Sequence, residues 1–152
     1  MESLMKLTYT IEQLTSEKDF TEHVKKYFRE EAPKISALFD NKLDYRNCPI
    51  YELAKNCIFL VCRRDGVVRG HMICYIFNSP LDPKVKILYQ LSFYVKPDSG
   101  RTAYHLFQKF IDIGKNQANH IITMLTSQTN IKPSTLENMG FKELETLYRM
   151  EV

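Results

Sequence analysis

Residues 86–117 read KILYQLSFYV, KPDSGR and TAYHLFQKFIDIGKNQ, which predicts a strand, a short loop and a helix around which the rest of the chain can be arranged. The alternation over 87–95 predicts two faces. They are Ile87, Tyr89, Leu91, Phe93 and Val95 on one side, and Leu88, Gln90, Ser92 and Tyr94 on the other. The first face suits a core. The second carries an amide, a hydroxyl and a phenol where a structural strand more often has Val or Ile, so it is a candidate functional surface.

The segment after the loop has apolar residues at three- and four-residue steps, which predicts an amphipathic helix facing a sheet. A strand, a short loop containing Gly100, Arg101 and Thr102, and a helix start can together hold a phosphate or pyrophosphate through free backbone amides and the positive end of the helix dipole. An ordinary crossover between parallel strands explains the same segment, so both interpretations stay open on this pattern alone.

The composition is that of one compact domain with a core, because the chain has 152 residues and is 44% hydrophobic. We therefore expect a single domain over 1–152. Twenty-one basic and eighteen acidic residues give a formal charge of +3, which is too mild to demand nucleic acid or an anionic membrane as partner. No apolar run reaches the length of a membrane span and the first residues show no cleavage site, so we expect a soluble, cytoplasmic protein.

Cysteine and histidine spacing gives no sign of a metal or a disulfide framework. The four cysteines form no Cys-x-x-Cys pair and lie mostly in apolar runs, which indicates reduced, buried thiols. The four histidines are scattered without metal-binding spacing, so we expect no metal site. His71 is a candidate base because histidine titrates near neutrality, and a structural role explains it as well.

The first half of the chain predicts a strand over 7–11 and then helices. Ser16 followed by Asp19 predicts a helix cap, and an apolar stripe continues to near Pro33. A second, shorter helix is predicted over 35–39.

Two apolar runs, 57–62 and 67–77, flank the dipeptide Asp65-Gly66, which predicts a β-hairpin. Both faces of the second run are apolar, so this strand should be central, with helices on both sides of the sheet. A turn over 78–83 leads antiparallel into the strand at 87–95.

The second half predicts one more buried strand, over 121–125. A full helix separates it from the strand at 87–95, so the two should be parallel. The polar cluster 126–130 follows it, at the edge where ligands collect in open α/β sheets. Pro133 predicts the start of a short helix that ends at Gly140, and 141–150 is strand-like.

The order of these elements, with four local signatures, resembles the GNAT superfamily of N-acetyltransferases, especially its small bacteriophage-encoded members. The signatures are Tyr94-Val95-Lys96-Pro97, Ala103 with Leu106-Phe107, Leu136-Glu137-Asn138-Met139-Gly140-Phe141, and Tyr148. The resemblance implies an α/β (α+β) fold with a mixed central sheet of about six or seven strands and helices on both faces. It also implies acetyl-CoA-dependent N-acetyl transfer, directly to an amine, in a cleft between splayed strands at 93–95 and 123–127.

The resemblance further implies that the first strand's backbone pairs with the pantetheine arm of the cofactor, while loop amides hold the pyrophosphate. The cofactor-binding residues assigned in this way are Phe93, Tyr94, Val95, Ser99, Gly100, Arg101, Thr102, Ala103 and Asn130. The candidate catalytic residues, as hydrogen-bonding groups near the transfer point, are Gln90, Ser92 and Ser127. No metal is implied.

The sequence departs from the family pattern at three places. Gln90 stands near the position where several members keep a glutamate base. The loop before Ala103 is shorter than the family's Gln/Arg-x-x-Gly-x-Gly/Ala and matches only at its last position, and Leu136 stands where the family usually has a general-acid tyrosine. One alternative is therefore a catalytically inactive GNAT-fold binding or virion-associated phage protein. Another is an acyltransferase acting on DNA bases, for which a basic face would be expected. The acceptor amine, on a host or phage macromolecule, and the oligomeric state, a homodimer included, stay open.

Overall fold

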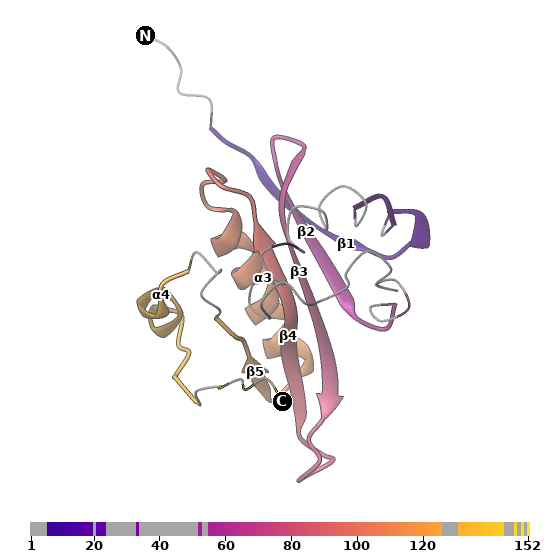
Figure 1. The fold of residues 1–152 in the computed structure, drawn as a ribbon, viewed down its shortest axis with the longest axis vertical. Coiled ribbons are helices and arrows are strands. Elements are labelled where there is room, and N and C mark those ends of the chain that lie inside the picture. The colour runs from indigo at the N-terminus through magenta and orange to yellow at the C-terminus, as the bar shows by residue number, and fades with distance from the viewer. Residues whose placement is uncertain are drawn as a thin grey trace.

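The computed structural model describes residues 6–19, 21–23, 33, 52, 55–125, 131–144, 148, 150 and 152 (Figure 1). These residues form an α/β fold around a five-stranded mixed sheet in the order β1-β2-β3-β4-β5. The strands are β1 (Tyr9–Leu14), β2 (Ile58–Arg64), β3 (Val67–Asn78), β4 (Lys86–Val95) and β5 (His120–Ile122), and the helices of the second half are α3 (Thr102–Gln117) and α4 (Pro133–Asn138). Of the predicted strand at 141–150, the described residues 141–144, 148 and 150 are not in a strand.

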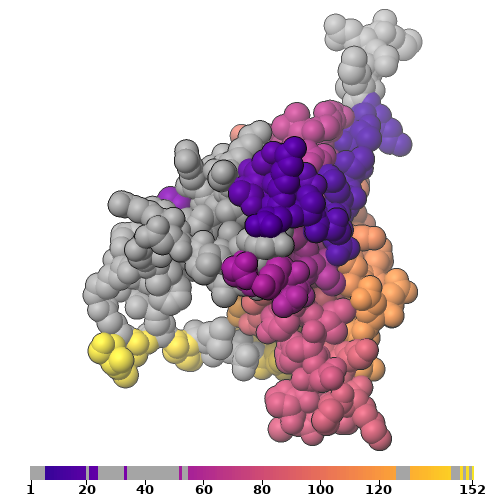
Figure 2. Space-filling view, turned by 90° about the vertical axis from the view of Figure 1, so that its right-hand side faces the viewer, coloured from indigo at the N-terminus to yellow at the C-terminus, as the bar shows by residue number. Residues whose placement is uncertain are grey.

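The antiparallel part of the sheet confirms the predicted hairpins. Asp65 and Gly66 both have positive φ, 51° and 82°, as in a type I′ turn, whose twist matches that of the flanking strands. β3 returns antiparallel as β4 through a turn in which the Ser79 N–H donates to the Val85 carbonyl at 2.8 Å. The β2–β3 turn and the β4–α3 loop lie at one end of the sheet, and the β3–β4 hairpin projects at the other (Figures 1 and 2).

α3 covers one face of the sheet, and its bounds confirm the helix predicted from the apolar stripe. Its buried side chains Leu106, Phe107 and Phe110 pack against strand residues of the main core; these are Leu60, Cys62, Met72, Cys74 and Leu88. A Cβ at Gly114 would overlap the Ile121 side chain, so glycine permits α3 to lie directly on β5. No helix within the described ranges is long and apolar enough to cross a membrane.

A second, smaller core lies on the opposite face. It consists of Leu14, Phe59, Val61, Val68 and Ile73. His23, from the helical turns that follow β1, packs edge-on against Phe59 with ring centroids 5.1 Å apart. The predicted cap of these turns is confirmed, because Ser16 Oγ accepts a hydrogen bond from the Asp19 N–H at 3.2 Å. The predicted helix over 35–39 lies outside the described residues.

Two cysteines of the main core, Cys62 and Cys74, are buried free thiols. Burial raises the pKa of Cys62 to about 11, although a hydrogen bond with Thr102 lowers it in part. Burial also raises the pKa of Cys74 to about 12. Because the thiolate is the reactive form, Cys62 and Cys74 serve as packing groups at neutral pH. Cys48 lies outside the described residues.

Candidate active site

Among the described residues, β4 and β5 are paired only along the first part of β4. They are parallel, as predicted, with Ile87 opposite His120, Leu88 opposite Ile121 and Tyr89 opposite Ile122 as the paired residues. β5 then ends, whereas β4 continues to Val95 and stays paired with β3 as far as Gly70. Within the described part of the chain, residues 90–95 therefore extend beyond the last β5 pair, and the backbone groups along that edge must be satisfied by something other than β5. We call this opening the fork.

Side chains close the base of the fork. The Thr123 hydroxyl donates to Gln90 Oε1, directly beyond the last backbone pair. The Tyr89 hydroxyl lies 3.0 Å from Met124 Sδ on the neighbouring segment. Gln90 is buried, so its amide fixes the point at which the two segments begin to separate.

A β-bulge at Leu91 changes which side chains of β4 share a face. Gln90 is opposite Cys74, but Ser92 is opposite Ile73, so Leu91 is an extra residue in the ladder. The faces predicted from simple alternation are therefore wrong beyond this point. Leu88, Gln90, Phe93 and Val95 face α3, whereas Ile87, Tyr89, Ser92 and Tyr94 face the opposite side, as their β3 partners show.

The bulge has two consequences for the predicted site residues. Phe93 turns toward α3, where its ring packs on Phe107 with centroids 5.2 Å apart. Ser92 and Tyr94 instead share a face with His71, whose Nε2 lies 3.5 Å from Ser92 Oγ and whose ring centroid lies 6.0 Å from that of Tyr94. Gln90 and Ser92, both predicted catalytic, therefore lie on opposite faces of β4.

The loop from Lys96 to Arg101 turns its carbonyl groups into the protein. Ser99 Oγ donates to the Lys96 carbonyl at 2.5 Å, and Thr102 Oγ1 donates to the Ser99 carbonyl at 2.7 Å. Two arginines of the β2–β3 hairpin hold the carbonyls between them: Arg69 Nη2 donates to Pro97 at 2.8 Å and Arg64 Nη1 to Asp98 at 3.2 Å. The hydroxyls of Ser99 and Thr102 are buried, so they shape the loop rather than point out of it.

Several amide groups of the same segment are left without an acceptor among the described residues. The Arg101 N–H donates to the Tyr9 hydroxyl at 3.0 Å, and the Thr102 N–H donates to the Ser99 carbonyl at 3.3 Å. The remaining N–H groups, for which no backbone acceptor is present in the described ranges, are those of Asp98, Gly100, Ala103 and Tyr104. With carbonyls inward and amides free at a helix start, the loop is suited to an anionic group.

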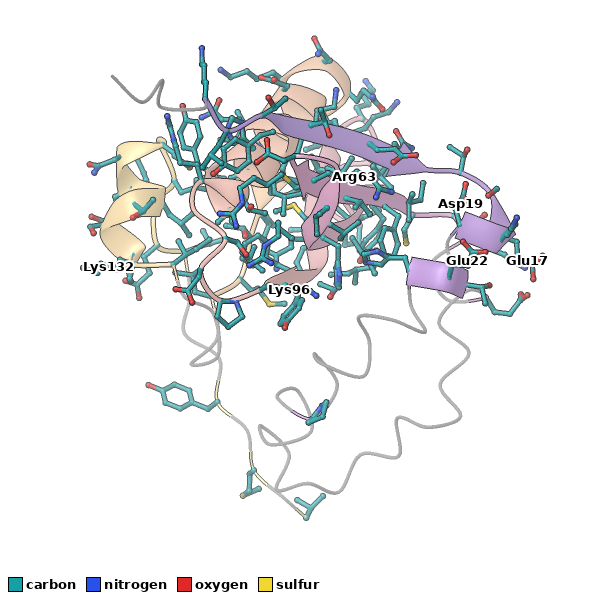
Figure 3. The ribbon with its side chains drawn as sticks, turned by 90° about the horizontal axis from the view of Figure 1, so that it is seen from above. Glu17, Asp19, Glu22, Arg63, Lys96 and Lys132 are labelled. Atoms are coloured by element: carbon teal, nitrogen blue, oxygen red, sulfur yellow. The ribbon has the colours of Figure 1, made fainter. Side chains whose placement is uncertain are left out.

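The positions of the other predicted residues follow from this loop. The Arg101 guanidinium lies 4.5 Å from the ring centroid of Tyr104, one turn along α3, and both side chains are exposed. Figure 3 looks onto this end of the sheet and shows Lys96 between α4, with Lys132, on one side and the first helical turns, with Glu17, Asp19 and Glu22, on the other. Ser127 and Asn130 lie outside the described residues.

Leu136, which stands where the resemblance implies a general-acid tyrosine, is part of the core. Leu136 of α4 is buried and packs with α3 side chains, and its carbonyl accepts a hydrogen bond from the Phe141 N–H at 3.0 Å. Phe141 in turn packs edge-on against Phe107. This site of the fold therefore supports α3 and offers no proton.

Several residues that hold the site in place are distant from it in sequence and were not predicted. Tyr9, Arg64 and Arg69 hold the loop, and His23 contacts His71. Each contact joins residues far apart in the chain, so no local pattern could reveal it. Among the described residues, no three His, Cys, Asp or Glu side chains come together as a metal site would require.

No protein-family model matches the chain, and no curated protein matches it in sequence. Solved structures match its fold. An aminoglycoside acetyltransferase from an uncultured soil metagenomic sample is 16% identical, with a TM-score of 0.66 over 95% of this chain and 99% of that chain. Aminoglycoside N-acetyltransferase AAC(6')-Iy, solved in complex with the bisubstrate analog CoA-S-monomethyl-acetylneamine, is 17% identical, with a TM-score of 0.65 over 95% and 99%. A Trypanosoma brucei acetyltransferase is 15% identical, with a TM-score of 0.64 over 95% and 100%.

These neighbours are GNAT-type acetyltransferases, and the coverage is nearly complete in both directions. The chain therefore has the fold of that class.

Proposed function

We propose that this protein is an acetyl-CoA-dependent N-acetyltransferase that transfers an acetyl group directly to an amine at the fork between β4 and β5. The fork is the observation that carries the proposal. A strand that continues past the end of its neighbour presents a backbone edge, and the amide-bearing pantetheine arm of coenzyme A can bind there as an added strand would. The CoA-containing complex of AAC(6')-Iy, which has the same fold, supports this assignment.

The β4–α3 loop supports the proposal from the other end of the cofactor. Its N–H groups without an acceptor among the described residues, which include those of Asp98 and Gly100, lie beside the first turn of α3. Such a set of donors, with the positive end of the helix dipole, suits a pyrophosphate. In this assignment the backbone of Phe93, Tyr94 and Val95 faces the pantetheine arm. Loop and helix-start residues, with Asn130 as a further predicted contact, face the nucleotide end.

The acyl thioester supplies the group to be transferred: the amine nitrogen attacks its carbonyl carbon, the thiolate leaves, and the nitrogen gives up a proton. The protein's part is to orient the two reactants and to accept hydrogen bonds at the transfer point, for which Gln90, Ser92 and Ser127 are the proposed residues. Because Leu136 lies in the core, the thiolate leaves without a proton from that position. A thiol's pKa near 8.5 makes it a good leaving group on its own.

The resemblance to bacteriophage-encoded members supports an acceptor amine on a host or phage macromolecule, with the protein acting in the host cytoplasm, alone or as a homodimer. The burial of Leu136 favours one second candidate, a catalytically inactive GNAT-fold binding or virion-associated phage protein. An acyltransferase acting on DNA bases is a third, which retention on DNA at low salt would support.

The test is the melting temperature of the protein in millimolar acetyl-CoA, with ATP as the control that lacks the pantetheine arm. A ligand that binds only the folded state at 100 times its dissociation constant stabilises it by about 2.7 kcal/mol. We expect a rise with acetyl-CoA that exceeds the rise with ATP. An unchanged melting temperature would overturn the proposal. A rise without acetyl transfer to any amine in a panel would favour the second candidate.

A further inference from the structure

Two buried histidines meet on the face of the sheet opposite α3. His71 of β3 is 3% exposed and His23 of the first helical segment is 7% exposed. His23 Nε2 lies 3.0 Å from His71 Nδ1, so one imidazole donates to the other. Phe59 lies against both rings, with centroids 5.1 Å from His23 and 5.5 Å from His71. Packing therefore holds the pair in place.

Ser92 connects this pair to the fork. The bulge at Leu91 turns the Ser92 side chain to the same face as His71, and the Ser92 Oγ lies 3.5 Å from His71 Nε2. Ser92 belongs to the part of β4 beyond its last β5 pair and is half-buried. Its hydroxyl can therefore contact a molecule in the fork while His71 lies behind it.

We propose that Ser92 and His71 carry away the proton that the acceptor amine loses, and that His23 orients His71 for this task; the inference rests on the proposed acetyl transfer. The N–H bond of the attacking amine breaks and its proton goes to Ser92 Oγ, while the Ser92 hydroxyl proton goes to His71 Nε2. His71 Nδ1 keeps its own proton and shares it with His23 Nε2. Serine ends as it began, and the positive charge rests on His71.

The chemistry suits these groups. A neutral imidazole has one unprotonated ring nitrogen that can accept a proton, so His71 can act as the base for a serine hydroxyl. The described groups around His71 are His23 from the first helical segment, Phe59 and Val61 from β2, and Ser92 and Tyr94 from β4. Both nitrogens of His71 are used, one toward the fork and one toward a buried partner. If the rings only packed against one another, the two nitrogens of His71 would not need to point at polar partners.

The proposal demands one tautomer. His71 must carry its hydrogen on Nδ1, donate to His23 and present an unprotonated Nε2 to the serine hydroxyl. If His23 were the donor instead, neutral His71 would carry its hydrogen on Nε2 and could accept nothing from Ser92.

The first experiment reads this tautomer directly, on the full ¹⁵N-labelled chain without acceptor. Long-range proton–nitrogen correlation spectra at pH 8 should show His71 protonated at Nδ1 and unprotonated at Nε2. In Ser92→Ala the His71 Nε2 resonance should move. A hydrogen on Nε2 of His71, or a resonance that Ser92→Ala leaves in place, would overturn the proposal whatever the outcome of the acetyl-CoA binding test.

The second experiment measures transfer to neamine as the probe amine. In His71→Gln and Ser92→Ala, we expect kcat to fall about 100-fold or more while the KM for acetyl-CoA stays within about twofold, because general-base catalysis typically contributes 10² to 10⁴. The acid limb of the kcat/KM profile should disappear in His71→Gln. His23→Gln should lower kcat less, since its amide oxygen can still accept from His71 Nδ1.

Phe59→Leu is the matched control, because Phe59 touches both imidazoles and exchanges no proton. It should keep the acid limb and most of kcat. An equal loss in Phe59→Leu and His71→Gln would show that packing alone matters and would overturn the relay. If the wild-type protein leaves neamine unmodified, the tautomer measurement decides, and the acetyl-CoA melting shift reports separately on the proposed function.

Discussion

The phenol oxygen of Tyr9, at the start of β1, accepts a hydrogen bond of 3.0 Å from the backbone N–H of Arg101, 92 positions later in the chain. The Tyr9 ring also stacks on His105 of α3, with centroids 4.5 Å apart. The first strand therefore fixes the start of α3 and the loop that precedes it. The loop takes its shape from β1 and from the β2–β3 hairpin.

Replacing Tyr9 by phenylalanine tests the hydrogen bond while keeping the stacked ring. The Arg101 N–H would lose its acceptor, so we expect Tyr9→Phe to lower the free energy of unfolding by about 1 kcal/mol, the net worth of a typical hydrogen bond. Urea denaturation measures the change. Tyr148→Phe, at a side chain that is 93% exposed, is the control and should change nothing. Equal stability of the two variants would contradict the prediction.

Gly100→Ala tests the close approach of the same phenol. Gly100 has φ of 58°, and a Cβ there would lie 2.5 Å from Tyr9 Oη. We expect a loss of about 1 to 3 kcal/mol, from backbone strain together with this contact. In the double variant with Tyr9→Phe, the contact disappears with the oxygen, so the combined loss should be smaller than the sum. Strict additivity in the urea titrations would show that the two positions do not interact.

A negative charge introduced at the start of α3 tests whether the β4–α3 loop binds the pyrophosphate. Tyr104→Glu places a carboxylate beside the free amides, and Tyr104→Gln removes the same ring without adding charge. We expect the carboxylate to weaken acetyl-CoA binding about tenfold or more relative to the glutamine variant at low salt, through repulsion of like charges. An acidic residue in the first turn stabilises a helix, so unfolding should not explain the loss. Isothermal titration calorimetry that finds equal affinities for both variants would place the phosphates elsewhere.

Because the thiols of Cys62 and Cys74 are buried, we expect the free energy of unfolding to fall at alkaline pH. Burial raises the pKa of Cys62 to about 11 and of Cys74 to about 12 in the folded protein, against 9.0 in the unfolded chain. Between pH 9 and 11 the unfolded chain therefore binds fewer protons, and the free energy of unfolding falls as pH rises. Well below pH 9 these thiols add no slope. Urea titrations from pH 7 to about 10.5 should show a shallower decline in a Cys62→Ala, Cys74→Ala double variant, and an unchanged slope would argue that other groups cause it.

Local patterns determined much of this fold. The apolar stripe placed α3, the dipeptide Asp65-Gly66 placed the β2–β3 turn, and the intervening helix made β5 parallel to β4. Each of these features depends on residues within one or two turns of one another, or on a connection whose length the sequence displays. The fork itself was expected from the resemblance to a family, and the loop amides from the strand-loop-helix order.

Only the tertiary structure decided which side chains come together at the site. The bulge at Leu91 shifts the β3–β4 register by one residue, which moves Phe93 to the core side and Ser92 to the side of His71. The meeting of His23 with His71, and of Tyr9 with Arg101, likewise joins segments that the sheet brings together from distant parts of the chain. Alternation in one strand cannot encode an extra residue, because a bulge is a property of a pair of strands.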